Sequence, residues 1–244
     1  SSPRHRGTDS VAWADLMNNG LRLKAGQKAR LVVLISGRGS NLQSFIDACD
    51  TGLLNAEIVA VISNKSAVHG LARAAAANIS NIAIDHRAFD SREEFDESLA
   101  QMIESYQPDL VVLAGFMRIL TGVFVNQFLG RLINIHPSLL PAYPGLNTHQ
   151  RAIDAGDSDA GATVHFVTTE LDGGPSILQA HVPIEPDDDP AVLSRRVLIL
   201  EHVIYPIAVQ WFCNGRLQMN SRVAYLDGTA LPEEGIIFSG TTEP

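Results

Sequence analysis

The residues best suited to chemistry are Asn134 and His136, which stand immediately before Pro137. They are two positions apart, so on an extended chain they share one face. Asparagine can donate a neutral hydrogen bond, and histidine can donate one and also carry a proton near neutral pH. Short motifs arise cheaply, so this one taken alone favours a structural alternative: a buried asparagine and a hydrogen-bonded histidine at a strand end.

A glycine-rich turn at residues 36–41 (SGRGSN) lies between an apolar run and a helical pattern. Backbone N–H groups and the positive end of a helix dipole would converge there, which suits a phosphate. The turn is not a dinucleotide fingerprint, because Leu42 occupies the third glycine position. It also lacks the Gly-Lys-Ser/Thr ending of an ATP-type loop. We expect a monophosphate site, with a structural tight turn as the alternative.

A carboxylate in a flexible setting, Asp172, precedes Gly173, Gly174 and Pro175. Glycines let a backbone approach a ligand closely, although an Asp in such a turn usually serves only the turn. Beside an imidazole, the carboxylate would favour the protonated ring and raise the pKa of the histidine. Asp172 would therefore gain a role if the fold brings it to His136, which would then be a cationic donor.

Other candidate groups favour structural interpretations. His149 and His165 could extend a histidine cluster, but the absence of H-E-x-x-H and of a carboxylate at ligand spacing argues against a metal site. His165 falls in an alternating strand pattern, which favours a packed side chain. Glycosidase-like carboxylate pairing is a further alternative. Its candidates fall mostly in predicted loops, where a solvated surface is the default: Glu170, Asp172, Glu185, Asp187 and Asp188.

The elements that must position these groups alternate strand and helix. Apolar runs predict buried strands at residues 31–35, 58–62, 110–114 and 132–135, with a short strand at 81–84. Helical patterns intervene, and Asp90 and Ser91 carry N-cap signals for one of them. This alternation predicts an α/β fold, a mostly parallel Rossmann-like sheet flanked by helices. Ligands bind beyond the carboxyl ends of such strands, where Asn134 and His136 would lie.

The C-terminal part predicts antiparallel additions. Residues 161–167 and 177–182 favour strands, residues 145–150 a loop before a short helix, and residues 223–231 a hairpin. After Asp189-Pro190 a long helix should reach residue 212, kinked or broken at Pro206. We predict a flexible extension at 1–28 with a short amphipathic turn at 11–17, one domain at 29–232, and a tail at 233–244.

The amino-acid composition argues against several classes of binding partner and cellular location. The net charge of −9 argues against a broad electrostatic grip on nucleic acid or an anionic membrane. Cys49 and Cys213 form no C-x-x-C, so we expect neither a disulfide scaffold nor a thiolate metal site. No apolar run reaches membrane-spanning length, and the N-terminus lacks a signal-peptide core. We predict a cytoplasmic protein, a monomer or homodimer that acts on small molecules.

Taken together, the motifs resemble one family, the phosphoribosylglycinamide formyltransferases. The likeness runs from about residue 30 to residue 232 and rests on residues 32–43 (VVLISGRGSNLQ), 62–65 (ISNK), 113–120 (LAGFMRIL), 134–141 (NIHPSLLP), 164–167 (VHFV) and 171–175 (LDGGP). The resemblance implies a metal-independent reaction of purine biosynthesis. In it, the formyl group of the co-substrate 10-formyltetrahydrofolate passes to the amine of glycinamide ribonucleotide.

The resemblance also implies three groups of site residues. The catalytic group is Asn134, His136 and Asp172. The ribonucleotide and phosphate group is Gly39, Ser40, Asn41, Leu42, Gln43 and Glu201. The folate group is Asn134 and Asp172 together with Arg92, Met117, Arg118, Ile119, Leu120, Thr168, Thr169, Glu170 and Leu171. The chemistry would need Asn134 and His136 as donors to the oxyanion formed by amine attack, with Asp172 keeping His136 protonated.

One departure and three alternatives remain. Many family members carry a histidine where this chain has Asn147, which cannot carry charge, so we leave Asn147 out of the catalytic group. A 10-formyltetrahydrofolate hydrolase would use the same catalytic group but usually has an added N-terminal domain. A methionyl-tRNA formyltransferase would need an RNA-binding domain and a basic surface. A non-enzymatic nucleotide-binding module would keep the phosphate turn without needing the catalytic group.

Overall fold

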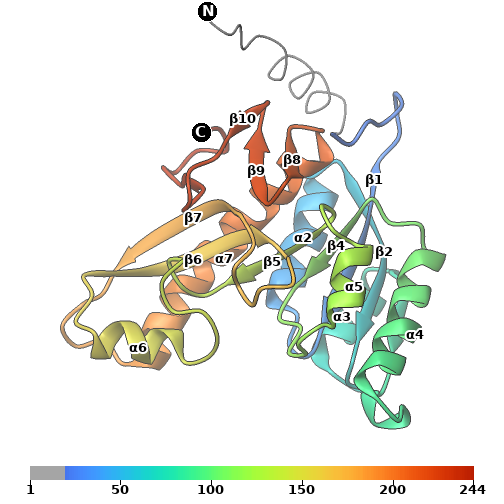
Figure 1. Ribbon diagram of the computed structural model, residues 1–244, viewed down its shortest axis with the longest axis horizontal. Helices are drawn as coiled ribbons and strands as arrows, with labels where there is room; N and C mark the ends of the chain where they lie inside the picture. The colour runs from blue at the N-terminus through green and yellow to red at the C-terminus, as the bar shows by residue number, and fades with distance from the viewer. Residues whose placement is uncertain (1–19) are drawn as a thin grey trace, which may run out of the picture.

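An eight-stranded sheet organises the computed structural model, which describes residues 20–244 (Figure 1). Its order is β11-β7-β6-β5-β4-β1-β2-β3. The strands are β1 (Ala29–Ile35), β2 (Ala56–Ser63), β3 (Asn81–Ala83), β4 (Leu110–Leu113), β5 (Leu132–His136), β6 (Asp159–Phe166), β7 (Ser176–Pro183) and β11 (Ile236–Ile237). β1 to β5 pair in parallel, whereas β6 is antiparallel to both β5 and β7. The predicted class, a mostly parallel α/β sheet with antiparallel additions, is confirmed.

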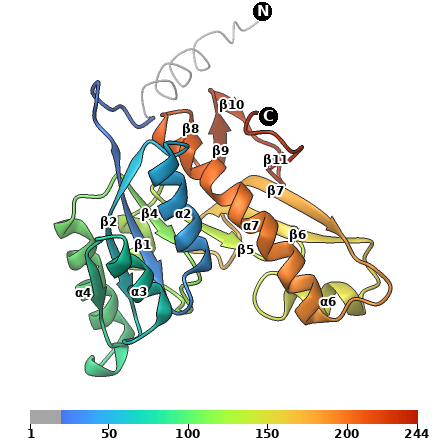
Figure 2. The same ribbon diagram turned by 180° about the vertical axis from the view of Figure 1, so that it is seen from behind.

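Helices cover both faces of the sheet, which explains the continuous apolar runs of the central strands. The helices on one face, turned to the viewer in Figure 2, are α2 (Ser40–Thr51), α3 (His69–Ala76) and α7 (Pro190–Cys213). Those on the other face are α4 (Arg92–Ser105) and α5 (Gly122–Gln127). Side chains of β1 alternate between the two layers: Leu31, Val33 and Ile35 join the core with α2 and α7, and Val32 and Leu34 the core with α4 and α5.

Two helix starts follow the predicted capping signals. The Ser91 hydroxyl accepts a hydrogen bond from the Glu94 N–H at the start of α4. The Asp189 carboxylate accepts one from the Val192 N–H at the start of α7, where Pro190 occupies the first turn. Each cap satisfies an N–H group that has no partner within its helix.

Of the predicted kink or break at Pro206, the break is excluded, because α7 continues through this residue to Cys213. A proline inside a helix removes one backbone hydrogen bond and disfavours the turn before it. Pro206 is buried, as are its neighbours Tyr205 and Ile207, and α7 packs on β6 and β7. The apolar burial of this half of the helix therefore outweighs the lost hydrogen bond.

A three-stranded antiparallel sheet follows α7. Its strands are β8 (Leu217–Asn220), β9 (Val223–Leu226) and β10 (Thr229–Ala230). β9 and β10 form the predicted hairpin, whereas β8 and β11 were not predicted. β11 lies within the predicted tail at residues 233–244 and pairs with Leu178 and Gln179 of β7. Part of that tail therefore belongs to the main sheet.

The predicted extension at residues 1–28 is described only from residue 20 onwards. Its predicted turn at residues 11–17 lies outside the described residues. Leu21 and Leu23 pack against the core as partly buried side chains, so this end of the segment contacts the domain. Within residues 20–244, no helix is long and apolar enough to cross a membrane.

Candidate active site

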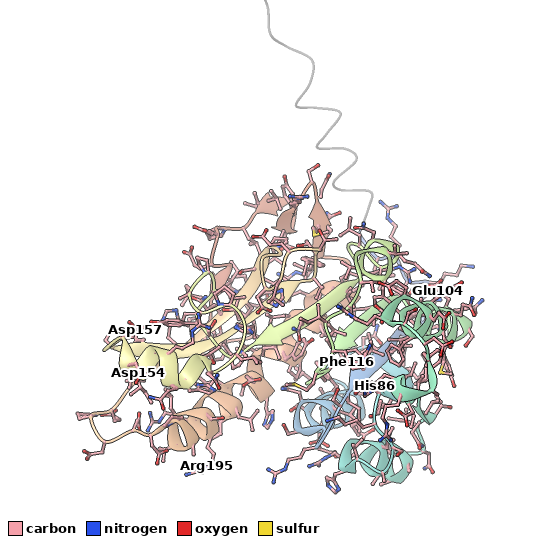
Figure 3. The ribbon with its side chains drawn as sticks, turned by 60° about the horizontal axis from the view of Figure 1, so that its bottom comes forward. His86, Glu104, Phe116, Asp154, Asp157 and Arg195 are labelled. Atoms are coloured by element: carbon pink, nitrogen blue, oxygen red, sulfur yellow. The ribbon has the colours of Figure 1, made fainter. Side chains whose placement is uncertain are left out.

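A cavity of about 690 Å³ opens beyond the carboxyl ends of β4 and β5, where parallel α/β sheets bind their ligands. Its walls come from residues 113–120, 134–137, 145–149 and 165–172, with Asn41 of α2 and Glu201 of α7. In Figure 3, Phe116 is labelled on the segment after β4, close to the label of His86, and Asp154, the last residue of α6 (Thr148–Asp154), lies on the opposite side of the molecule.

The cavity collects most of the predicted site residues. The three residues predicted to be catalytic line it, as do Asn41 and Glu201 of the predicted ribonucleotide group and residues 117–120 and 168–171 of the predicted folate group. Arg92 is not among its lining residues. Its Nη2 instead donates to the Ile119 carbonyl at 2.7 Å, so it supports the wall formed by residues 117–120. Gly39, Ser40, Leu42 and Gln43 also lie outside the lining.

Strand alternation brings Asn134 and His136 into the cavity, while Ile133 and Ile135 enter the core with α7. The Asn134 amide has no hydrogen-bond partner among the described residues, so its N–H groups are available to a ligand. The His136 ring is buried, and its Nε2 lies 2.8 Å from the Tyr143 carbonyl oxygen. Neighbouring side chains on one strand thus offer a free donor and an oriented imidazole.

Asp172 reaches the same place from a distant turn. Its Oδ2 lies 3.5 Å from His136 Nδ1 and accepts the Gly145 N–H at 2.8 Å, and its Oδ1 lies 3.9 Å from His165 Nε2. The turn needs glycine at position 174, because an added Cβ would collide with the Phe166 carbonyl oxygen. This tight packing holds the carboxylate beside His136, as the sequence predicted.

The three histidines of the cavity differ in their surroundings. Burial lowers the pKa of His165, whose Nδ1 lies 2.9 Å from the Phe166 carbonyl oxygen. Burial, and then the charge of His136, lowers the pKa of His149. Both rings therefore favour the neutral form. His136 instead has Nε2 facing the Tyr143 carbonyl, so Nδ1, which lies 3.5 Å from Asp172 Oδ2, is the nitrogen left to face a ligand.

The glycine-rich turn lies at the N-terminus of α2, as predicted. Gly39 (φ 72°) occupies the N-cap position, and no side chain caps the helix. The first N–H groups of the helix therefore have no intrahelical partner and point toward a potential anion. An added Cβ at Gly39 would lie 2.8 Å from Gly70 Cα, and the Gly70 N–H donates to the Gly37 carbonyl at 3.0 Å. The turn thus depends on close backbone packing.

Two residues of the predicted phosphate group use their side chains elsewhere. Leu42 is buried in the core, so only its backbone could meet a phosphate. The Gln43 N–H bonds the Gly39 carbonyl, and its side chain contacts Asp47 and Arg73. Anion binding here would rely on the backbone of the turn.

Asn41 and Glu201 connect the turn to the cavity, because both line it. Asn41 Nδ2 donates to Glu201 Oε1 at 3.3 Å, and both side chains are nearly buried. Burial raises the pKa of Glu201, and the hydrogen bond from Asn41 opposes this shift. A carboxylate in this position can accept hydrogen bonds from ligand hydroxyl groups.

The folate-side segments give the cavity an apolar rim. Met117, Ile119, Leu146 and Leu171 expose their side chains around it. The segment after β4 is held by its backbone, since the Met117 N–H donates to Ser36 Oγ at 2.8 Å. Exposed apolar side chains around a concave site are typical of ligand-binding surfaces.

The sequence did not predict the part that residues 143–149 play. Tyr143 and Gly145 contribute a carbonyl and an N–H to the catalytic group, and Asn147 and His149 line the cavity. Asn147 (φ 57°) starts α6 (Thr148–Asp154), so the predicted loop at 145–150 ends earlier. The available signal was its composition, since Pro, Gly and Asn are the residues of tight turns. Among the described residues, no group of three or more His, Cys, Asp or Glu side chains could hold a metal ion.

Known proteins share this architecture over most of the chain. Residues 29–209 match the family model described as formyl transferase. The chain is 54% identical over 205 residues to the phosphoribosylglycinamide formyltransferase of Escherichia coli (strain K12), covering 84% of this chain and 97% of that one. It is 49% identical over 206 residues to the Haemophilus influenzae protein of the same name, with coverages of 84% and 97%.

A solved structure extends the likeness to three dimensions. The phosphoribosylglycinamide formyltransferase of Coxiella burnetii, in complex with CHES, matches with a TM-score of 0.84 and 49% identity, covering 87% of this chain and 100% of that one. The matched region includes the glycine-rich turn, the catalytic group and Glu201. The predicted family is confirmed: the chain belongs to the formyl transferase family, alongside the phosphoribosylglycinamide formyltransferases.

Proposed function

We propose that this protein transfers the formyl group of 10-formyltetrahydrofolate to the amine of glycinamide ribonucleotide. One observation carries the proposal beyond the family likeness. The cavity lined by an Asn–His–Asp group also reaches Asn41 and Glu201, and Asn41 lies in the first turn of a helix whose N-terminus no side chain caps. The helix N-terminus suits a phosphorylated substrate and the Asn–His–Asp group suits acyl transfer.

The ribonucleotide would bind with its phosphate on the N–H groups at the start of α2. The protein carries a net charge of −9, so a local anion site must overcome an unfavourable overall field. Glu201 would accept hydrogen bonds from the ribose hydroxyl groups. This placement would direct the substrate amine along the cavity toward Asn134 and His136.

The formyl donor would occupy the wall formed by residues 117–120 and 168–172. Its exposed apolar side chains, Met117, Ile119 and Leu171, suit a flat heterocycle, and the volume of about 690 Å³ suits a ligand of drug-like size. Bound there, 10-formyltetrahydrofolate would supply the formyl carbon that the amine attacks. Its formyl group would then lie beside the catalytic side chains.

The catalytic group would stabilise the charge that develops on the formyl oxygen. Asn134 would donate a neutral hydrogen bond, and protonated His136 a charged one. As the new C–N bond forms and the bond to the folate nitrogen breaks, His136 would give its proton to the leaving nitrogen. Asp172 would hold the His136 ring and accept, through a water, the proton released by the amine.

A formyl-transfer assay with and without glycinamide ribonucleotide tests this function. We expect tetrahydrofolate to form only when the ribonucleotide is present, with formylglycinamide ribonucleotide as co-product. Folate product formed equally fast without the amine would indicate a hydrolase instead. No turnover under either condition, with ribonucleotide binding retained, would favour a nucleotide-binding module. A cytoplasmic location and a monomeric or homodimeric state remain predictions.

A further inference from the structure

A row of paired residues crosses the sheet from His136 to the C-terminal strand. His136 of β5 pairs with Thr163 of β6, Thr163 pairs with Gln179 of β7, and Gln179 pairs with Ile237 of β11. Directly opposed residues on antiparallel strands project to the same face of a sheet. The row therefore places one buried polar side chain, Thr163, beside the candidate catalytic histidine and a second, Gln179, one strand further on.

Gln179 is 3% exposed, and its buried polar groups have hydrogen-bond partners. Its Nε2 donates to the Leu140 carbonyl at 3.1 Å and to Thr163 Oγ1 at 3.0 Å. Its Oε1 lies 2.9 Å from His181 Nε2, and its backbone carbonyl accepts the Phe238 N–H at 2.8 Å. Buried networks of this kind specify one arrangement, because each unpaired member would be costly.

The same network holds the loop that follows His136. Thr163 Oγ1 donates to the Ser138 carbonyl at 2.8 Å and accepts the Leu140 N–H at 3.1 Å. Leu140 is therefore bonded through both its N–H and its carbonyl. Ser138 Oγ donates to the Ala142 carbonyl at 2.6 Å, which fixes the residue before Tyr143. The loop thus returns the Tyr143 carbonyl to His136 Nε2.

We propose that Gln179 is a positioning residue for His136: with Thr163 it fixes the loop of residues 137–143, whose Tyr143 carbonyl orients the imidazole ring. This inference rests on the proposed function, in which His136 donates to the formyl oxygen. Gln179 lies two strands away from His136 and is not a lining residue of the cavity. Loss of its amide would leave the Leu140 carbonyl without this donor and release the loop.

The test is Gln179→Met, which keeps the length of the side chain and removes both donors. Gln218→Met is the matched control, because Gln218 is also a buried glutamine in a strand but lies in the small sheet. We expect Gln179→Met to lower kcat about tenfold or more with little change in KM, since misplacing a catalytic group by about 1 Å costs on the order of 10²-fold. Gln218→Met should retain the wild-type kcat.

Histidine-labelled NMR gives a readout that a general loss of stability would not produce. The His136 ring resonances should move in Gln179→Met and remain in place in Gln218→Met. Unmoved His136 resonances in folded Gln179→Met overturn the proposal whatever the rate. The NMR measurement does not depend on turnover. If the wild-type protein shows no transfer activity, the proposed function is contradicted, but the NMR shifts still test the role of Gln179.

A second pair of variants applies if Gln179→Met fails to fold. Thr163→Val removes the hydroxyl group that joins Gln179 to the loop, and Thr163→Ser keeps it. We expect kcat to fall in Thr163→Val and to recover in Thr163→Ser. Equal kcat values for these two variants overturn the proposal.

Discussion

The two ends of the candidate site, the turn at the start of α2 and the cavity beyond β5, use different parts of the chain. The end at α2 presents backbone N–H groups from one continuous turn, which depends on glycine packing between residues 39 and 70. The other end presents side chains from separate segments: Asn134 and His136 from β5, and Asp172 from the turn after β6. Substitutions at the first end should act only if they move the backbone, whereas the identity of each side chain matters at the second.

This difference separates binding from chemistry. A phosphate that binds to backbone groups tolerates many side-chain changes, provided that the turn keeps its shape. Oxyanion stabilisation requires particular donors at particular distances, so it has no comparable tolerance. The two ends should therefore respond differently in KM and in kcat.

The largest expected effect is the loss of His136. His136→Ala should lower kcat by about 10²–10³-fold, the usual cost of removing one oxyanion donor. Ribonucleotide binding, measured by calorimetry, should remain because the phosphate end is unchanged. His86→Ala is the control, since His86 does not line the cavity. Near-normal turnover of His136→Ala, or binding lost in parallel with the rate, would contradict the separation of the two ends.

A smaller effect is expected at the backbone end. Gly39→Ala places a Cβ 2.8 Å from Gly70 Cα at a position with φ 72°. It should raise the KM for the ribonucleotide about tenfold, equivalent to roughly 1.4 kcal/mol of binding, with little change in kcat. Gly52→Ala is the matched control, because it ends the same helix at φ 79° with no atom within 4 Å of an added Cβ. Equal KM values for the two variants would show that the turn does not bind the substrate.

The smallest effect is one of stability, at Glu201. Burial raises its pKa, so the folded protein holds this proton more tightly than the unfolded chain does. The associated stability is present at low pH and is lost as the pH rises through the folded pKa. Glu201→Gln should therefore raise Tm at neutral pH. Ribonucleotide binding should weaken.

Thermal melts at neutral and at acidic pH check this sign. The advantage of Glu201→Gln should disappear below roughly pH 4, where free glutamate is itself protonated. A gain in Tm that persists unchanged at acidic pH would show that relief of a buried charge is not its cause. A lower Tm at neutral pH would show that the carboxylate stabilises the fold.

The central strands were predictable from the sequence, because a strand that is buried on both faces has a continuous run of apolar residues. The same signal located the strand end that carries Asn134 and His136. The runs at residues 31–35 and 110–114 are continuous and apolar, and they form β1 and β4. The turn at residues 36–41 was equally clear, because its glycines, the preceding strand and the following helix are adjacent in sequence. Local patterns thus locate the turn for which we predict phosphate binding.

The remaining features depend on contacts between distant segments. β11 has two residues, and its stability comes from its pairing with β7 rather than from its own composition. Pro206 predicts a helix kink or break, but α7 is continuous because the residues around it are buried. The Tyr143 carbonyl and the Gly145 N–H reach the catalytic group only because the loop folds back on β5. No local pattern encodes such backbone contacts.

β11 also has a consequence for solubility. β7 has eight residues and lies between β6 and β11, and within residues 20–244 β11 pairs with its outer edge at Leu178 and Gln179. An uncovered strand edge is a template for pairing with another molecule. Proteolytic cleavage between Pro232 and Ile236 would free β11 to leave, and the exposed edge could then recruit a second chain. Aggregation after such cleavage would precede any loss of the central sheet.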